Sequence, residues 1–275
     1  MMNKILLKMA TKIHYKFPFL RPYLSFIYDV HMVKFAGWGM RTIHELPWND
    51  EYDGEIFRKA STDIKKIEFS KGSTTGIDRN NVDTLLWRHW IVSYSIRHAI
   101  EFAESINFNF VECGVADGIT AFFALREICG HKKTANNFSM HLYDAWNQMR
   151  KEGLLESELS RVGGYVEISI DRTKRNLTEF KDNVVYHQGY IPESFSMLPE
   201  HPNQIIYLHI DLNSANNTLS TLEFFYPRLV RGGVILFDDY GSMAFEDTKK
   251  TVDAFFFGKS GILLKFPTGQ AIYFC

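Results

Sequence analysis

The fold of this chain is decided by the stretch FNFVECGVADG, residues 108–118. Residues 108–113 form a short, largely apolar run, which predicts a buried strand that ends at Gly114. Gly118 then precedes an apolar helical pattern at residues 119–129. A strand, a glycine turn and a helix in this order predict the first unit of a parallel α/β sheet.

Short apolar runs and helical stretches continue to alternate after this unit. Such alternation predicts parallel strands joined by right-handed crossovers, with helices on both faces of the sheet. The turn at residues 267–269 (Pro-Thr-Gly) predicts a final antiparallel hairpin at the sheet edge. We expect strands at residues 108–113, 140–145, 184–188, 205–212, 234–237, 262–266 and 271–274, and helices at residues 119–129 and 218–229.

Three further segments complete the predicted organisation. Residues 83–105 have apolar side chains at helical spacing, which predicts a long helix leading into the core domain. Residues 49–81 are polar and rich in turn-forming residues, so we expect a linker or a flap. We therefore divide the chain into an N-terminal extension, residues 1–82, and a core domain, residues 83–275. Residues 147–182 leave from the carboxyl edge of the sheet, where ligands bind, and are expected to form a substrate-side lid.

The composition excludes several classes of protein. A chain of 275 residues that is 45% hydrophobic fits one large domain with a sizeable core. The 31 lysines and arginines nearly balance the 32 aspartates and glutamates, so we expect no nucleic-acid partner. Cys113, Cys129 and Cys275 are scattered, which argues against a disulfide framework and favours a reducing compartment, the cytoplasm.

The first 28 residues are basic and rich in large apolar side chains. No apolar run reaches the roughly 18 residues that a membrane span requires, and Lys8 interrupts what would be a signal-peptide core. Peripheral contact with the inner membrane face is one interpretation of such a segment. We favour the other, a helix packed on the domain or on a second subunit of a homo-oligomer.

Two strand ends have residue types that suit a nucleoside. Glu112 precedes Gly114, and Gly118 opens a helix whose N-terminus offers free amide groups; glycine there lets a ligand approach the backbone. The Glu-x-Gly-x-x-x-Gly spacing differs from the Gly-x-Gly-x-x-Gly of dinucleotide sites, which weighs against a pyrophosphate cofactor. Asp144 ends the next strand, where its carboxylate can accept both hydroxyls of a ribose.

Three aspartates follow two later strands. His209 and Asp211 share one face of their strand, and Asp211 is at its tip. Asp238 and Asp239 are adjacent, so both reach one point only if their strand has already ended. Three carboxylates within about 4 Å of each other repel, which predicts a compensating cation. Oxygen-only ligands favour magnesium, calcium or manganese over zinc. The alternative is that Asp239 caps a loop and Asp211 binds backbone amides.

On these residues the chain resembles the class I S-adenosylmethionine-dependent methyltransferases, over roughly residues 108–275. Glu112, Gly114 and Gly118 match the first motif of that family, and Asp144 matches its ribose-binding acid. The resemblance implies a Rossmann-like α/β fold with a seven-stranded, mostly parallel sheet and a C-terminal antiparallel hairpin, here preceded by an N-terminal helical extension. It also implies S-adenosylmethionine as the cofactor.

A narrower resemblance is to the macrocin-type (TylF/MycF-like) sugar O-methyltransferases. It rests on Asp211, Tyr-Pro-Arg-Leu at residues 226–229, Gly-Gly at 232–233 and Asp-Asp-Tyr-Gly at 238–241. It implies that Asp211, Asp238 and Asp239 hold Mg²⁺, which binds two neighbouring hydroxyls of a small-molecule or glycan acceptor. The family's Asp-Gly-Asp-Leu-Tyr turn reads DLNSA here, residues 211–215, so the identity of the acceptor stays open.

The activity implied by these resemblances is metal-dependent O-methylation of a sugar or glycan-like hydroxyl. Asp211 is the family-like catalytic base, and His209 is a second candidate by position, although strand histidines are more often core residues. The main alternative is a non-catalytic scaffold or binding subunit with the same fold. An aminopropyl transferase is disfavoured by the Asp-Asp-Tyr-Gly ending.

Overall fold

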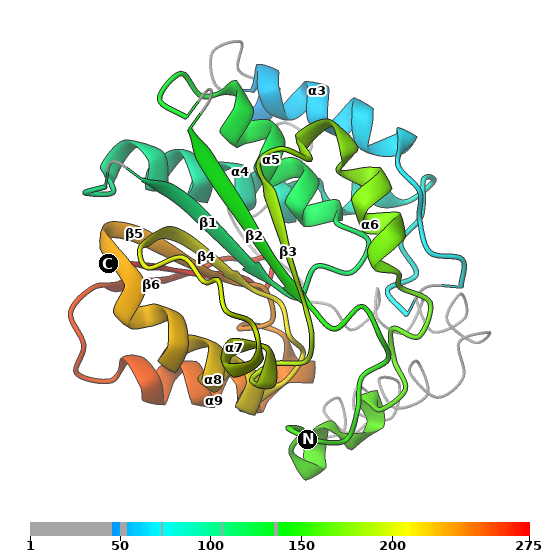
Figure 1. Cartoon of the computed structure of the whole chain (residues 1–275), viewed down its shortest axis with the longest axis vertical. Helices are drawn as coiled ribbons and strands as arrows, with labels where there is room; N and C mark the ends of the chain where they lie inside the picture. The colour runs from blue at the N-terminus through cyan, green and yellow to red at the C-terminus, as the bar shows by residue number, and fades with distance from the viewer. Residues whose placement is uncertain (1–45, 50–53, 73, 106, 135–136) are drawn as a thin grey trace, which may run out of the picture.

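A seven-stranded sheet forms the centre of the computed structural model, which describes residues 46–49, 54–72, 74–105, 107–134 and 137–275 (Figure 1). The strands are β1 (Phe108–Cys113), β2 (Phe138–Asp144), β3 (Val184–Gln188), β4 (Ile205–Ile210), β5 (Leu229–Phe237), β6 (Ile262–Lys265) and β7 (Ala271–Phe274). Their order is β3-β2-β1-β4-β5-β7-β6. Strands β1 to β5 are parallel, and β7 is antiparallel to both β5 and β6. The predicted Rossmann-like sheet with its antiparallel hairpin is confirmed.

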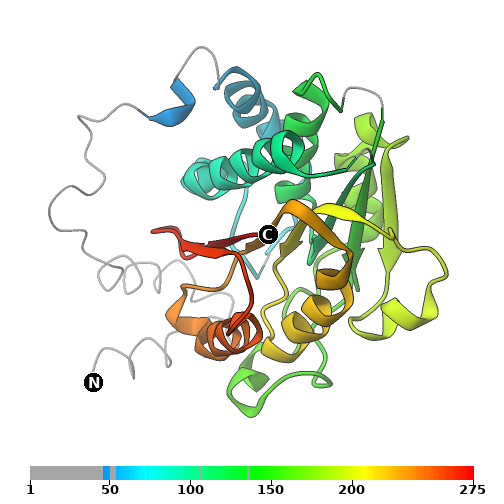
Figure 2. The same cartoon turned by 90° about the vertical axis from the view of Figure 1, so that its left-hand side faces the viewer.

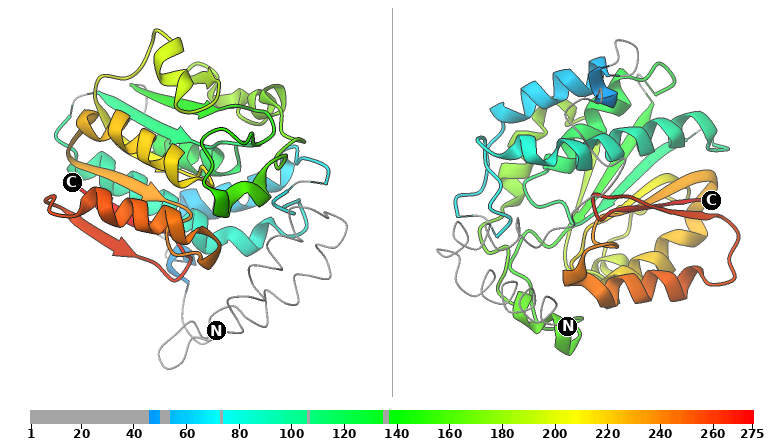
Figure 3. Two further views of the ribbon diagram at one scale, coloured as in Figure 1. Left: turned by 90° about the horizontal axis from the view of Figure 1, so that it is seen from below. Right: turned by 180° about the vertical axis from the view of Figure 1, so that it is seen from behind.

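Helices cover both faces of this sheet (Figure 2). They are α3 (Glu55–Asp63), α4 (Leu86–Phe102), α5 (Ile119–Gly130), α6 (Ile170–Asn176), α7 (Glu193–Met197), α8 (Ala215–Phe225) and α9 (Glu246–Phe256). Helices α3, α4 and α5 lie on one face, and α8 and α9 lie side by side on the other (Figure 3). Because side chains alternate along a strand, Phe110 and Tyr207 join the core under α4 and α5, while Val111 and Leu208 join the core under α8.

The predicted elements are present, with shifts at their ends. Strand β4 ends two residues before the predicted limit, and α8 begins at Ala215, where the preceding Ser214 side chain accepts the Asn217 N–H. Strand β5 begins at Leu229 and contains the Gly-Gly pair that we expected before it. The pairing of β4 with β5 is irregular there, and a Cβ on Gly232 would lie 2.1 Å from the Phe102 carbonyl oxygen. The Gly-Gly pair therefore lets β5 pack closely against the end of α4.

Part of residues 49–81 was predicted wrongly as a linker or a flap. Helix α3 lies there and packs on α5, with Phe57 fully buried against Trp90 and Phe123. The helix is short and polar on its outer face, so its average composition resembled that of a loop. The basic segment at residues 1–28 lies outside the described residues. In the described ranges, no helix has the length and apolar character needed to cross a membrane.

Candidate active site

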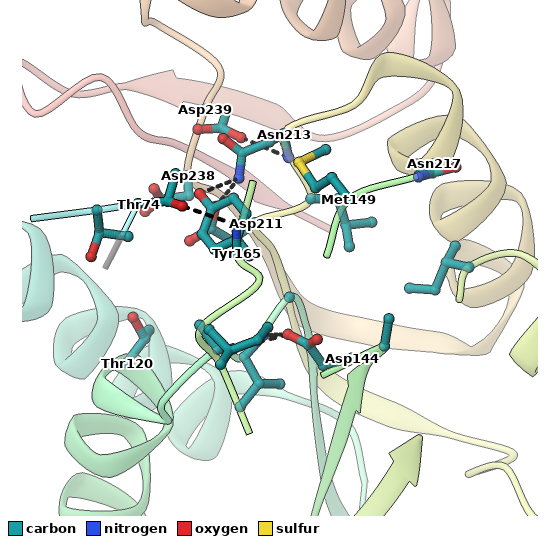
Figure 4. Close-up of a pocket in the computed structure, with 18 of the residues that line it drawn as sticks. Thr74, Thr120, Asp144, Met149, Tyr165, Asp211, Asn213, Asn217, Asp238 and Asp239 are labelled. Atoms are coloured by element: carbon teal, nitrogen blue, oxygen red, sulfur yellow. Dashed lines mark hydrogen bonds between the residues drawn. The ribbon is translucent and has the colours of Figure 1, made fainter. Parts of the chain in front are cut away.

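The carboxyl ends of the five parallel strands meet around one cavity of about 400 Å³ (Figure 4). Residues at or just after these ends line it, one from each strand: Gly114, Asp144, Gly189, Asp211 and Asp238. This is the place where ligands bind in open α/β sheets. Asp144, which was predicted to bind a nucleoside, and the three aspartates that were predicted to bind a metal therefore line the same cavity.

Asp144 holds the glycine turn that follows β1. Its Oδ2 accepts the backbone N–H groups of Val115 and Ala116 at 2.7 and 2.9 Å, and its Oδ1 accepts that of Trp146 at 2.6 Å. Burial raises the pKa of this carboxyl, and the three N–H donors oppose the rise. Asp144 is thus both a cavity-lining acid and the link between the ends of β1 and β2.

The other three residues of the predicted nucleoside site have different positions. Gly114 lines the cavity, and a Cβ on it would lie 1.9 Å from the carbonyl oxygen of Asp211, so glycine is required for the ends of β1 and β4 to approach. Gly118 caps α5 in a left-handed conformation and packs beside Thr173. Glu112 is buried and is not among the cavity-lining residues. Direct contact with a cavity ligand is therefore available to Gly114 and Asp144.

The three aspartates predicted as metal ligands form a compact group. Ligand oxygens of Asp211, Asp238 and Asp239 all lie within 4.8 Å of one another, and we call these residues the acid trio. Strand β5 ends at Phe237, so Asp238 and Asp239 follow the strand, as their convergence requires. Asp239 Oδ2 also accepts the Asn213 N–H at 3.1 Å. The trio therefore offers the oxygen-only ligands that a hard divalent cation prefers.

A cation from α4 already contacts this trio. Arg88 Nη2 lies 2.8 Å from Asp211 Oδ2 and also forms an ion pair with Asp238. Burial and the charge of Asp238 raise the pKa of Asp211 to about 6. Although burial favours the neutral acid, Arg88 and His209 lower the pKa of Asp238 to about 2. Arg88 was missed in the sequence because an arginine within a helical pattern carries no metal-site or nucleotide-site signature.

His209 lies behind the cavity, between Glu112 and Asp238. Its Nδ1 is 3.6 Å from Glu112 Oε1, and its Nε2 is 3.8 Å from Asp238 Oδ1. Burial alone lowers the pKa of a histidine, but the two carboxylates outweigh burial and raise the pKa of His209 to about 10. The imidazole is fully buried and is not among the cavity-lining residues. It therefore lies between a carboxylate of β1 and the carboxylate that follows β5, and does not face the cavity.

The segment predicted as a lid contributes Met149 and Tyr165 to the cavity. Its 3₁₀ helix (Glu156–Arg161) ends in a buried arginine that fixes it to the turn after β4. Arg161 donates hydrogen bonds of 2.6 Å to the carbonyl oxygens of Asn213 and Ala244, and its guanidinium lies 3.2 Å from Glu158. The segment is therefore attached directly to the turn that carries Asp211.

The Tyr165 hydroxyl also meets this turn. Asn213 has a left-handed backbone conformation, with φ 53°, and its Nδ2 donates to Tyr165 Oη at 3.2 Å (Figure 4). The Asn213 amide thus links the turn after β4 to the segment that was predicted as a lid. Neither Arg161 nor Tyr165 was singled out from the sequence, because their partners are distant along the chain.

Comparisons with known proteins agree with this geometry. No curated protein matches the chain. Among solved structures, the O-methyltransferase NovP is 18% identical with a TM-score of 0.57, over 69% of this chain and 79% of that chain. CalS11, described as a calicheamicin methyltransferase, is 13% identical with a TM-score of 0.55, over 88% and 99% of the two chains. A family model described as "Methyltransferase domain" (Methyltransf_24) matches residues 111–240, from β1 to just beyond β5. Residues 111–240 are therefore similar to a methyltransferase domain, and the chain has a Rossmann-like methyltransferase fold.

Proposed function

We propose that this chain transfers the methyl group of S-adenosylmethionine to a hydroxyl of a sugar or glycan-like acceptor, with Mg²⁺ or another hard divalent cation at the acid trio. The observation that carries this proposal is the shared cavity, which is lined by Asp144 and by all three aspartates. The methyltransferase domain supports methyl transfer. A second structure of CalS11 describes it as a TDP-rhamnose 3'-O-methyltransferase, at 14% identity and a TM-score of 0.50 over 84% and 96% of the two chains, which supports a sugar hydroxyl as acceptor.

The cofactor would lie at the β1 and β2 ends of the cavity. Asp144 would accept one ribose hydroxyl with the lone-pair site that its three backbone donors leave free, and Gly114 would give close access to the backbone. Glu112 and Gly118 would support this end indirectly, the first through His209 and the second by starting α5. The acid trio would then line the part of the same cavity that is left for the acceptor.

The acceptor would lie between the cofactor and the lid. A bound divalent cation would polarise the acceptor hydroxyl and lower its pKa. Asp211 lines the cavity and is better placed than His209 to take the hydroxyl proton. The hydroxyl oxygen would form a bond to the methyl carbon as the carbon–sulfur bond breaks, its proton would pass to Asp211, and S-adenosylhomocysteine would leave. The protein's contribution is to align the two reactants, since the sulfonium already activates the methyl group.

The test is methyl transfer from labelled S-adenosylmethionine to a panel of sugars with neighbouring hydroxyls, with and without a chelator. We expect transfer that stops with chelator, returns with Mg²⁺, and falls at least a hundredfold in Asp238→Asn. Asp171→Asn, at an exposed position of α6, is the matched control and should keep the chelator-sensitive rate. Full transfer in chelator and in Asp238→Asn would remove the cation from the proposal. Cofactor binding without transfer to any sugar would favour a binding subunit.

A further inference from the structure

Arg88 occupies the point at which a cation would meet the acid trio. It lies in the first turn of α4, just after the 3₁₀ helix η4 (Val82–Leu85), and its side chain reaches the ends of β4 and β5. A single nitrogen, Nη2, contacts both Asp211 Oδ2 and Asp238 Oδ2. The guanidinium therefore lies between two of the three carboxylates instead of beside one of them.

A divalent cation and this guanidinium would compete for these oxygens. Mg²⁺ binds carboxylate oxygens at about 2.0–2.1 Å and demands near-octahedral geometry. Arg88 Nη2 contacts the Oδ2 atoms of Asp211 and Asp238, whereas their Oδ1 atoms accept Asn213 Nδ2 and Gln270 Nε2, so an ion at the trio would meet the same Oδ2 atoms as Arg88. Two positive charges at one group of acids would also repel each other. An ion that binds these oxygens would thus weaken or displace the contact of Arg88.

Three features of the contact between Arg88 and the acid trio indicate that an ion can replace it. It uses one nitrogen, whereas the strongest arginine–carboxylate pairs are bidentate. Arg88 Nε is buried and makes no hydrogen bond within the described ranges. The side chain is 29% exposed and lines the cavity, so its head has open space on one side. An entering ion would displace the guanidinium into that space.

From these contacts we propose that Arg88 is a built-in counter-cation of the acid trio, which competes with the divalent ion and sets the metal affinity of the site. The proposal rests on the cation site of the proposed function and adds a residue that controls it. Until an ion enters, the positive charge of Arg88 offsets the negative charge of the three carboxylates. Removing its charge should therefore make the trio a stronger metal site.

The test is the affinity of the full chain for Mn²⁺, measured by the electron paramagnetic resonance signal of the free ion, without S-adenosylmethionine. Arg88→Met keeps much of the aliphatic stem, and Arg88→Gln keeps a neutral hydrogen-bond donor. We expect both variants to bind Mn²⁺ at least tenfold more tightly than the wild type. The matched control is Arg150→Met, because Arg150 lines the same cavity but pairs with Glu193; its affinity should stay within threefold of wild type.

Two further measurements keep the result decisive. Thermal unfolding checks folding: without metal Arg88→Met should melt below the wild type, and Mn²⁺ should raise its melting temperature more. If that variant does not fold, Arg88→Gln carries the comparison. Equal or weaker Mn²⁺ binding in the folded variants, or no binding in any protein, would overturn the competition. Binding of S-adenosylhomocysteine is measured separately. A failure of the proposed function would appear in that measurement, and the Mn²⁺ affinities of the variants could still be compared.

Discussion

Asp144, just at the end of β2, and Asp211, just after β4, line the same cavity from opposite sides of β1. The chain passes from β1 to β2 and β3 on one side, then returns to place β4 and β5 on the other. The strand order thus reverses between β1 and β4, and such a reversal opens a ligand crevice at the carboxyl ends. The topology thus explains how acids from the two halves of the sheet come to line one cavity.

Replacing Asp144 with alanine should weaken binding of S-adenosylhomocysteine at least tenfold. The change removes a charged acceptor, whose hydrogen bonds are worth about 1.5–3 kcal/mol each, and releases the N–H groups of Val115 and Ala116. Titration calorimetry measures the affinity, with Asp171→Asn as the control. An unchanged dissociation constant for Asp144→Ala would show that this acid does not hold the nucleoside.

Replacing Gly114 with alanine should destabilise the domain by about 3 kcal/mol or more, because the new Cβ would lie 1.9 Å from the Asp211 carbonyl oxygen. Gly72→Ala is the matched control: its φ is also positive, at +67°, but a Cβ there meets no atom within 4 Å. Only backbone strain of about 1–2 kcal/mol is expected at Gly72. Equal loss in the two variants by urea denaturation would contradict the close approach of β1 and β4.

Replacing Arg161 with methionine should lower the free energy of unfolding by about 3–5 kcal/mol, because it leaves the buried Glu158 carboxylate without its cation. The lost hydrogen bond to the Asn213 carbonyl should also loosen the turn after Asp211 and slow methyl transfer. Arg175→Met removes an exposed ion pair with Glu68 and should leave stability nearly unchanged. Similar stability in the two variants would rule out the anchoring role of Arg161.

The free energy of unfolding should fall in acid, because two histidines with lowered pKa values lie near the β3 edge of the sheet. Burial lowers the pKa of both His141 and His187 from 6.5 to about 4, and the two rings share a 2.9 Å contact. The unfolded state therefore binds more protons as the pH falls, so the stability that these histidines contribute is complete above about pH 6.5 and is lost toward pH 4. The substitution His141→Asn keeps a polar group near the position of Nδ1 and removes one of the two titrating rings.

The measurement is the free energy of unfolding of wild type and His141→Asn by urea, at intervals from about pH 7 to pH 4. The variant should lose less stability over this range than the wild type does. Parallel curves for the two proteins would mean that the histidine contact does not couple protonation to folding.

The sequence was sufficient to predict the sheet and the residues at its carboxyl edge. Short, partly apolar runs of five or six residues between helical stretches leave few alternatives, so β1 and β3 have their predicted bounds. Asp144 ends such a strand and the aspartates at 211, 238 and 239 follow two others, and parallel strands bring their carboxyl ends to one edge. The convergence of the acid trio therefore follows from local pattern and topology together.

Contacts between distant segments could not be predicted in this way. Arg88 reaches Asp211 from a helix, and Arg161 reaches Asn213 from the lid. Arginine is common on exposed helix faces, so neither position has a pattern of its own. The same applies to Glu112, which ends up facing His209 behind the cavity because alternate residues of β1 point to opposite faces of the sheet.

The most direct test of the shared cavity is a crystal structure of the chain grown with S-adenosylhomocysteine and Mn²⁺, with the ion located by its anomalous scattering. We predict one anomalous peak bound by Asp211, Asp238 and Asp239, and a nucleoside whose ribose contacts Asp144, both within the same cavity. A nucleoside or an ion bound in separate cavities would contradict the account.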